Sequence, residues 1–192
     1  MSLITVHRAA RTFQPCVSAH WDAESSTVSC DIEYAAAPEE NRTTLRDEID
    51  RQFNITAPTY FITGGMFSMA LDSQKRIKDW DIYTNPARWT EYTLPFADAT
   101  PATPIIDTVF DRNGRAEDMG EPDTYYEPLR GTLYLSWSEA TAWYAVAPSL
   151  ALGVMSDDTL AQIRLDGLFV QRAAHGPTGR WTRLLRCLRA GN

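Results

Sequence analysis

The chain has 192 residues, of which 44% are hydrophobic and 22% are charged, and its formal net charge is -7. These proportions are ordinary for a folded globular domain and exclude a disordered or collagen-like chain. No run approaches the roughly 18 to 20 apolar residues of a transmembrane helix. A short apolar cluster near the N-terminus precedes basic residues, the wrong order for a signal peptide, so we expect a soluble, cytoplasmic protein that does not bind membranes.

Charge is distributed unevenly along the chain. Five arginines and no acidic residue lie between Arg172 and the C-terminus, so the preceding residues carry -12, five units more negative than the whole chain. This balance argues against nucleic-acid binding, which usually requires a basic domain or face. Sixteen arginines against two lysines, with abundant alanine, are typical of a GC-rich bacterial genome.

The cysteines, histidines and glycines form no recognisable chemical motif. Cys16, Cys30 and Cys187 are widely spaced without a CxxC pair, which favours free thiols over a disulfide framework or a zinc site; Cys16 and Cys30 could still meet across a hairpin. The histidines lie far apart, and the chain has no P-loop, dinucleotide-binding pattern or GxSxG motif. We therefore predict no cofactor and no metal ion, and these absences favour a protein without catalytic activity.

The first third of the chain predicts a hairpin followed by a helix. Residues 16–34 alternate apolar and polar positions around a polar turn at 22–26, the pattern of two paired strands. Residues 38–53 open with a proline and two glutamates and then place apolar residues at four-residue spacing. This pattern predicts an amphipathic helix over about 38–53.

The middle of the chain predicts two further hairpins. Residues 60–71 and 77–84 are expected to pair, and the adjacent glycines at 64 and 65 predict a bulge or a close backbone approach inside the first strand. Asn113-Gly114 is a strong hairpin turn signal. The same stretch resembles the start of an EF-hand calcium loop, but the fifth and twelfth positions are Arg115 and Pro122, which do not fit that motif.

The last third predicts the hydrophobic centre of the fold. Residues 131–137 and 161–169 alternate as strands, and a short apolar run lies at 150–155. Ser136 and Glu139 have the spacing of a capping box, which predicts a short helix over about 138–147 that ends at Pro148. Apolar residues spaced as one helical stripe predict a C-terminal amphipathic helix over about 178–190.

These elements together predict an α+β fold, in which residues 1–192 form a single domain with the three helices packed on a largely antiparallel sheet. The order of the elements excludes a regular doubly wound βα fold.

Two features indicate a surface for a protein partner. Residues 107–127 are strongly acidic, and a cluster of one charge sign speeds and orients association with an oppositely charged partner. Aromatic residues in predicted loops are typical anchors at protein interfaces. The candidate partner-binding residues are Asp111, Glu117, Asp118, Glu121, Asp123, Tyr125, Tyr126, Trp89 and Tyr92.

The sequence therefore favours a non-catalytic acidic binding protein, such as a bacterial inhibitor or immunity protein that neutralises a basic partner, for example a toxin domain. The alternative is a small-ligand-binding protein or hydrolytic enzyme with an aromatic and carboxylate pocket, because paired carboxylates in one cleft can do acid and base work. A third hypothesis is a subunit that forms homo-oligomers through its C-terminal helix.

Overall fold

The computed structural model describes residues 4–10, 14–34, 60–92, 98–116 and 118–170. Their regular structure is almost entirely β-sheet, and the one helical element is a single 3-10 turn, η1 (Pro86–Arg88). The prediction of an α+β fold is therefore wrong for the described residues. The helices predicted over about 38–53 and 178–190 lie outside these residues. No described helix is long and apolar enough to cross a membrane.

The helix predicted over about 138–147 is wrong, because this stretch forms strand β12 (Ala142–Ala147), paired with β13 (Leu150–Val154). Trp143, Tyr144 and Val146 are aromatic or β-branched residues that suit a pleated sheet. The Ser136 hydroxyl, which the capping-box pattern assigned to a helix start, donates to Ser138 O instead. Pro148, the predicted end of that helix, lies instead in the tight turn between β12 and β13.

Five strands form the first sheet, in the order β2-β3-β6-β5-β4, and all neighbours are antiparallel. The predicted hairpin over 16–34 is confirmed as β2 and β3. The strands of this sheet are β2 (Cys16–Asp22), β3 (Thr27–Glu33), β4 (Tyr60–Gly64), β5 (Phe67–Leu71) and β6 (Ile77–Tyr83). Cys16 faces Glu33 and Cys30 faces Ala19 across the β2–β3 pair, and both thiols are free.

The stretch predicted as one strand over 60–71 is instead the hairpin β4–β5. Gly64 pairs with Phe67, so Gly65 and Met66 form a two-residue turn. Gly65 has a φ of 58°, a conformation that glycine adopts without the steric cost of a side chain. The predicted close approach at Gly64 is confirmed, because a Cβ atom there would lie 2.3 Å from Gly120 O.

Seven strands form the second sheet, in the order β7-β10-β11-β14-β13-β12-β8. The strand predicted at 131–137 is confirmed as β11, and the strand predicted at 161–169 is confirmed over 161–165, in β14, which ends before residues 166–169. The neighbours are antiparallel except at the two edges, where β7 and β8 pair in parallel. The remaining strands of this sheet are β7 (Thr90–Glu91), β8 (Thr100–Pro101), β10 (Asp123–Glu127), β11 (Thr132–Ser136) and β14 (Leu160–Leu165).

A separate two-stranded ribbon pairs β1 (Thr5–Ala9) with β9 (Thr103–Asp107). The turn predicted at Asn113-Gly114 follows β9: Gly114 has a φ of 74°, and a single bridge joins Phe110 to Ala116. The turn is therefore confirmed. The strand expected before it, over 105–110, is found in part as β9, which ends at Asp107, and the expected pairing across the turn is a single bridge.

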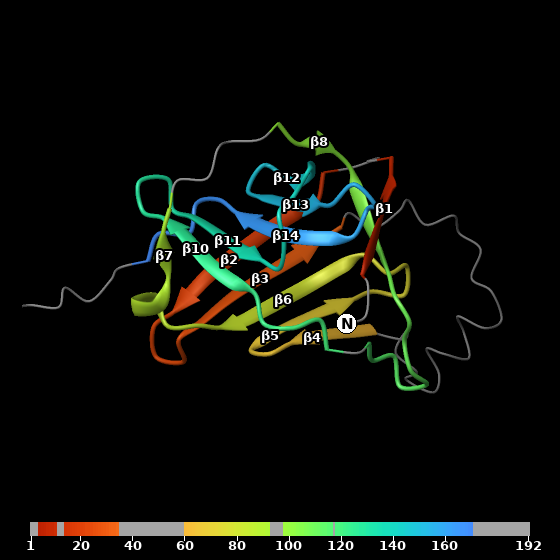
Figure 1. The fold of residues 1–192 in the computed structure, drawn as a ribbon, viewed down its shortest axis with the longest axis horizontal. Coiled ribbons are helices and arrows are strands. Elements are labelled where there is room, and N and C mark those ends of the chain that lie inside the picture. Colours follow the sequence, from red (N-terminus) through yellow and green to blue (C-terminus); the bar gives the residue numbers. More distant parts are fainter. Residues whose placement is uncertain (1–3, 11–13, 35–59, 93–97, 117, 171–192) are drawn as a thin grey trace, which may run out of the picture.

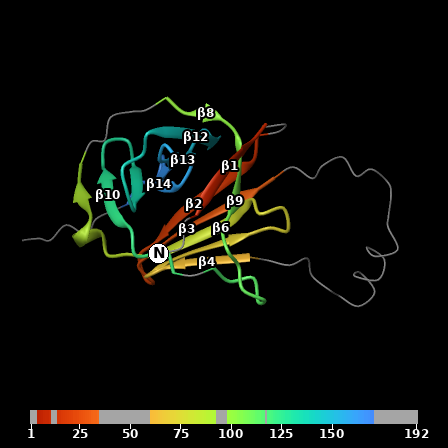
Figure 2. The same cartoon turned by 45° about the vertical axis from the view of Figure 1, so that its right-hand side comes forward.

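The two large sheets lie in two layers and share one hydrophobic core (Figures 1 and 2). The inward side chains of β11 and β14 include Leu133, Leu135 and Ile163, each at most 1% exposed. Trp80 on β6 is also 1% exposed. Trp137, which follows β11, joins the layers because its ring meets Phe67 edge-on at 5.2 Å. The opposite face of each sheet points away from this core.

Candidate functional site

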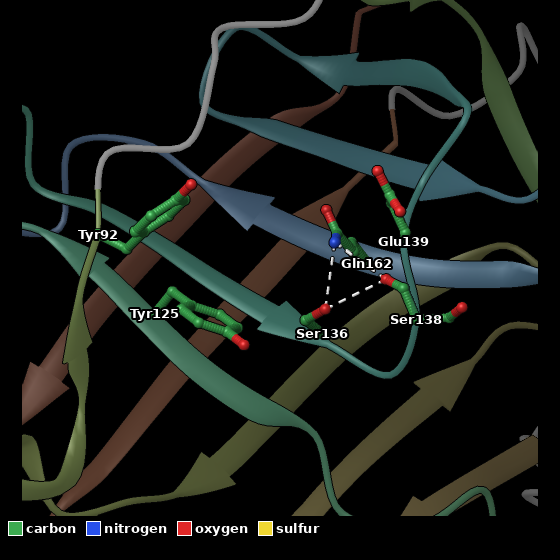
Figure 3. Close-up of a pocket in the computed structure, with 6 residues that line it drawn as sticks. All are labelled: Tyr92, Tyr125, Ser136, Ser138, Glu139 and Gln162. Carbon is green, nitrogen blue, oxygen red and sulfur yellow. Dashed lines mark hydrogen bonds between the residues drawn. The ribbon is translucent and has the colours of Figure 1, made fainter.

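The outward face of the seven-stranded sheet carries a shallow pocket of about 430 Å³. We call it the aromatic pocket; it is lined by Tyr92, Tyr125, Ser136, Ser138, Glu139 and Gln162. Figure 3 shows these side chains on one side of the sheet, with the two tyrosines at one end and Glu139 at the other. The tyrosine rings meet edge-on at 6.3 Å, so the pocket has an aromatic wall and a polar, carboxylate-bearing wall.

Strand register brings these residues together. Tyr125 on β10 lies opposite Tyr134, and Ser136 on β11 lies opposite both Asp123 and Gln162. Because side chains alternate between the faces of a strand, Asp123, Tyr125, Ser136 and Gln162 all project from the outward face. The pocket floor is therefore built on three adjacent strands rather than on loops.

A hydrogen-bond network fixes the polar wall. Gln162 Nε2 donates to Ser138 O at 2.9 Å and to Ser136 Oγ at 3.1 Å, and Ser136 Oγ donates to Ser138 O at 3.2 Å. The Gln162 amide oxygen points away from Ser136 (Figure 3), and no hydrogen bond to it occurs within the described residues. The wall thus presents a fixed acceptor oxygen beside the exposed Glu139 carboxylate.

Beyond Gln162, the same face becomes buried. Arg164 is 5% exposed; its Nε lies 3.2 Å from Asp166 Oδ2, and its guanidinium lies 5.6 Å from the centre of the Trp143 ring. Burial raises the pKa of Tyr134, which is opposite Arg164, above its ordinary value. Because Asp166 balances its charge, Arg164 does not make the neighbouring pocket cationic.

A second depression of about 620 Å³ lies beside the aromatic pocket, at the start of β10. We call it the acidic groove; it is lined by Met66, Tyr83, Thr84, Asn85, Arg88, Trp89, Glu121, Pro122, Asp123 and Thr124. Glu121 packs against the β4–β5 turn, where its Cβ lies 2.7 Å from the position of a Cβ added at Gly65. Together the two linings hold three carboxylates, on Glu121, Asp123 and Glu139, and the Arg88 cation.

Four of the candidate residues predicted from the sequence meet on this surface. Tyr92 and Tyr125 form the aromatic wall, and Glu121 and Asp123 line the adjacent groove. Tyr92 is 54% exposed. These four residues are therefore placed where a partner can reach them.

Two other predicted anchors, Trp89 and Tyr126, are buried, with 6% and 2% exposure. Trp89 packs between Trp21 and Tyr126, with ring centres 5.6 Å and 5.0 Å away. The Tyr126 hydroxyl donates to Leu168 O at 2.9 Å. Both side chains are thus mainly occupied in holding the two sheets together, although one part of Trp89 lines the acidic groove.

Two further predicted acidic residues, Asp111 and Asp118, do not line either depression. The Asp111 carboxylate accepts hydrogen bonds from Asn113 N and Arg115 N, each at 2.8 Å, and these bonds, Arg115 first, lower its pKa. Its turn lies at the opposite side of the molecule from β7 in both ribbon views (Figures 1 and 2). Asp118 accepts from Gly120 N at 2.7 Å. Glu117 lies outside the described residues.

The polar wall was missed by the sequence analysis. Ser136 and Glu139 match only the spacing of a capping box, which predicts a helix here and no site, and Ser138 and Gln162 carry no motif. The alternation that makes Ser136 and Gln162 face outward is the one local signal that bears on the wall. Their convergence depends on the pairing of β11 with β14, which connects residues 26 positions apart.

Neither the known protein families nor the curated proteins contain a match to this chain. Within the described ranges, no group of three or more histidine, cysteine, aspartate or glutamate side chains is placed to hold a metal ion.

Proposed function

We propose that this protein is a non-catalytic acidic binding protein that captures cationic side chains of a basic protein partner at the aromatic pocket and the acidic groove. Neutralisation of a basic toxin domain by an inhibitor or immunity protein in the bacterial cytoplasm fits this activity. The observation that carries the proposal is the placement of two tyrosine rings and three carboxylates in two neighbouring depressions, on β10, β11 and β14 and the loops beside them.

The chemistry of the lining supports a guanidinium or ammonium group as the bound species. Such cations are attracted to the faces of aromatic rings, and arginine also pairs with carboxylates through several N–H donors. The acceptor oxygen of Gln162 adds a neutral partner for one more N–H. A cation between Tyr125 and Glu139 would therefore meet aromatic, amide and carboxylate groups at the same time.

The surface is already assembled in the free protein. Ser136 and Gln162 are held by the sheet and by each other, so little side-chain freedom remains to be lost when a partner binds. The acidic groove extends this surface along β10, which allows more than one basic side chain to bind.

A small-ligand site is the second candidate, because a volume of about 430 Å³ lies within the usual range for small-molecule pockets. The exposure of Tyr92, Ser138 and Glu139 favours a partner that covers the pocket from outside. A ligand confined to one pocket would leave the acidic groove empty.

The test uses a fluorescent peptide of alternating arginine and glycine, which carries charge but is a poor strand former. We expect its affinity to fall about tenfold with Tyr125→Ala and a few-fold with Glu139→Gln. Binding should also weaken as salt is added. The free amino acid derivative acetyl-arginine amide should bind far more weakly than the peptide if the groove also contributes.

Glu24→Gln is the matched control for Glu139→Gln. Glu24 is an exposed glutamate in the β2–β3 turn, on the other sheet, and its loss changes the net charge by the same amount. If Glu24→Gln weakens binding as much as Glu139→Gln, the peptide responds only to net charge and the proposal is wrong. Equal affinity for acetyl-arginine amide and for the peptide would support the small-ligand candidate instead.

A further inference from the structure

Most sheet edges of the described chain are short or covered. The end strands of the seven-stranded sheet, β7 and β8, have two residues each. The open side of β4 is covered, because Phe61 N donates to Gly114 O, Ala116 N to Phe61 O and Met119 N to Thr63 O, at 2.8 to 2.9 Å. The β1–β9 ribbon is bonded on both sides, through Val6 N to Asp158 O and Ile106 N to Lys75 O.

The outer edge of β2 is the exception. It spans seven residues, Cys16–Asp22, and ends the five-stranded sheet. Its backbone makes no hydrogen bond within the described residues other than those to β3. Ser18, Ala19 and His20 are all exposed, and the strand contains neither proline nor lysine, the residues that commonly protect an edge. Such an edge can accept another strand.

The face beside this edge is acidic. Strand register places Asp31 opposite Ser18 on one side and opposite Asp79 on the other, and it places Asp81 opposite Ser29. Glu33, at the end of β3, points to the same outward face and is exposed. The positive or titratable neighbours are Lys78, next to Asp79 in the chain, and His20, which lies opposite Ser29. Among the residues that the structure describes, these four carboxylates therefore outnumber the cations on this face.

These carboxylates oppose one another. Like charges directly opposite on neighbouring strands destabilise a sheet, and Asp31 and Asp79 are such a pair. Burial raises the pKa of Asp79; Lys78 lowers it, and Asp81 and Asp31 raise it further. A positively charged guest on this face would reduce the repulsion.

We propose that the outer edge of β2 binds an extended, basic segment of the protein partner as a sixth strand of the five-stranded sheet. The inference rests on the proposed function only in taking the partner to be a basic polypeptide. It adds a second contact surface, with a different mode of recognition, on the other sheet.

The geometry of β2 defines the guest. Side chains of a paired strand alternate between faces, so every second guest residue would lie beside the half-buried Val17 and Trp21 and should be apolar. The intervening residues would lie beside Ser18 and His20 and should be arginine or lysine. Ser18 is small, which leaves room for a long guest side chain to cross β2 and reach Asp31.

Charge disfavours a second copy of this chain as the occupant. An antiparallel pair of β2 strands would place two acidic outer faces side by side, and each chain carries a net charge of -7. Like-charged surfaces repel on association. A basic strand has the complementary charge.

The test uses the acetylated, amidated heptapeptide RVRVRVR, with amide hydrogen exchange of the full-length protein measured residue by residue. We expect alternate amides of β2 to exchange rapidly in the free protein and to become protected when the peptide binds. The acidic peptide EVEVEVE should not bind. A version of RVRVRVR with N-methyl groups on alternate residues keeps the charge but cannot pair, and it should bind about tenfold more weakly.

Ser18→Lys should abolish peptide binding, because lysine on an edge strand blocks pairing and repels the guest. Ser68→Lys is the matched control: Ser68 is an exposed serine on the same outward face, but it lies on the inner strand β5. It adds the same charge without touching the edge and should leave protection of β2 unchanged. If Ser18→Lys does not fold, the comparison of methylated and unmethylated peptides on the unaltered protein decides the question.

Several results would overturn the proposal. RVRVRVR could bind without protecting β2, or the methylated peptide could bind equally well. Protection of β2 in the free protein that rises with concentration would identify a second copy as the occupant, and protection independent of concentration would identify another segment of this chain. A Tyr125→Ala variant separates the two proposals, because it should weaken the arginine-glycine peptide while leaving protection of β2 by RVRVRVR intact.

Discussion

The two sheets expose carboxylates in contrasting settings. On the seven-stranded sheet, Glu139 stands beside a hydrogen-bonded polar wall and an aromatic wall, which together shape a pocket. On the five-stranded sheet, Asp31 faces Asp79 directly, beside an edge strand whose outer side no described residue pairs with. The first arrangement provides shape and several kinds of contact, whereas the second provides charge at a cost in stability. The contrast supports our two proposals, that the first face binds individual side chains and that the second binds an extended chain.

The largest expected effect tests whether the two faces depend on one core. Trp80→Ala should cost about 3–5 kcal/mol of unfolding free energy, because a large buried side chain leaves a cavity. Trp80 lies beneath the acidic face, in the cluster shared by both sheets. Urea unfolding followed by hydrogen exchange in both sheets should therefore show a parallel loss of protection.

Trp80→Phe is the control for this prediction. The Trp80 indole N–H is buried without a hydrogen-bond partner among the described residues, so phenylalanine removes an unsatisfied donor and should cost less than alanine. Loss of protection in the five-stranded sheet alone would show that the sheets unfold independently and would weaken the comparison.

The next effect concerns the acidic groove. Gly64→Ala places a Cβ atom 2.3 Å from Gly120 O, and such overpacking should cost about 1–3 kcal/mol. Because Gly120 directly precedes Glu121, the substitution should also displace the groove and weaken binding of the arginine-glycine peptide. Thermal unfolding and peptide anisotropy measure the two effects.

Gly167→Ala serves as the comparison for Gly64→Ala. Gly167 has a φ of 83°, and a Cβ there would meet nothing within 4 Å. This variant should show a cost of about 1–2 kcal/mol from backbone strain alone, with peptide affinity unchanged. Equal losses of peptide affinity in both variants would contradict the role of the Gly64 approach in placing the groove.

A smaller effect tests the acidic face through pH. The pKa of Asp79 is raised by burial and by Asp81 and Asp31, so the folded state holds this proton more tightly than the unfolded state does. The stabilisation is present below the unfolded pKa and is lost as the pH rises through the folded pKa. Asp79→Asn should therefore stabilise the protein at pH 7 by a few tenths to about 1 kcal/mol.

The gain from Asp79→Asn should shrink as the pH falls through the folded pKa of Asp79 and should vanish only well below the unfolded pKa of about 3.9, where the aspartate is protonated in both states. Asp111→Asn should behave in the opposite way, because hydrogen bonds lower the pKa of Asp111 and its contribution is lost as the pH falls. Melting temperatures across pH 3 to 8 check both signs. A destabilised Asp79→Asn protein at pH 7 would mean that the carboxylates of this face do not repel one another.

The smallest effect concerns chemical reactivity and leaves stability unchanged. Burial, with a smaller effect from Asp31, Asp81 and Asp79, raises the pKa of Cys30 to about 12, whereas Cys16 is exposed on β2. Because the thiolate is the reactive form, a maleimide at pH 7.5 should label Cys16 and spare Cys30 until the protein is unfolded. Peptide mapping by mass spectrometry distinguishes the two, and a bound RVRVRVR peptide should slow labelling of Cys16.

Local signals predicted the strands well and the helix at 138–147 badly. The strands predicted at 16–34, 131–137 and 161–169 alternate over several residues, a pattern that few other structures share, although the last of them ends at Leu165. The capping-box spacing at Ser136 is a weaker signal, because serine also bonds to neighbouring backbone in turns. Local signals also failed for Trp89 and Tyr126, which were predicted to be exposed anchors for a partner. Their burial follows from the packing of the two sheets and not from their neighbours in the chain.

The amino-acid sequence alone determined which side chains of each strand can face the same way, because alternation is a local property of extended backbone. It also determined the acidic balance of the chain and the turn at Gly114, whereas the turn at Gly65 was not predicted. Only the tertiary structure decided that Tyr125, Ser136 and Gln162 meet in one pocket, that Asp31 faces Asp79, and that β2 remains an edge. These outcomes depend on which distant strands pair and in which register, and the pairing is selected by burial of one shared core.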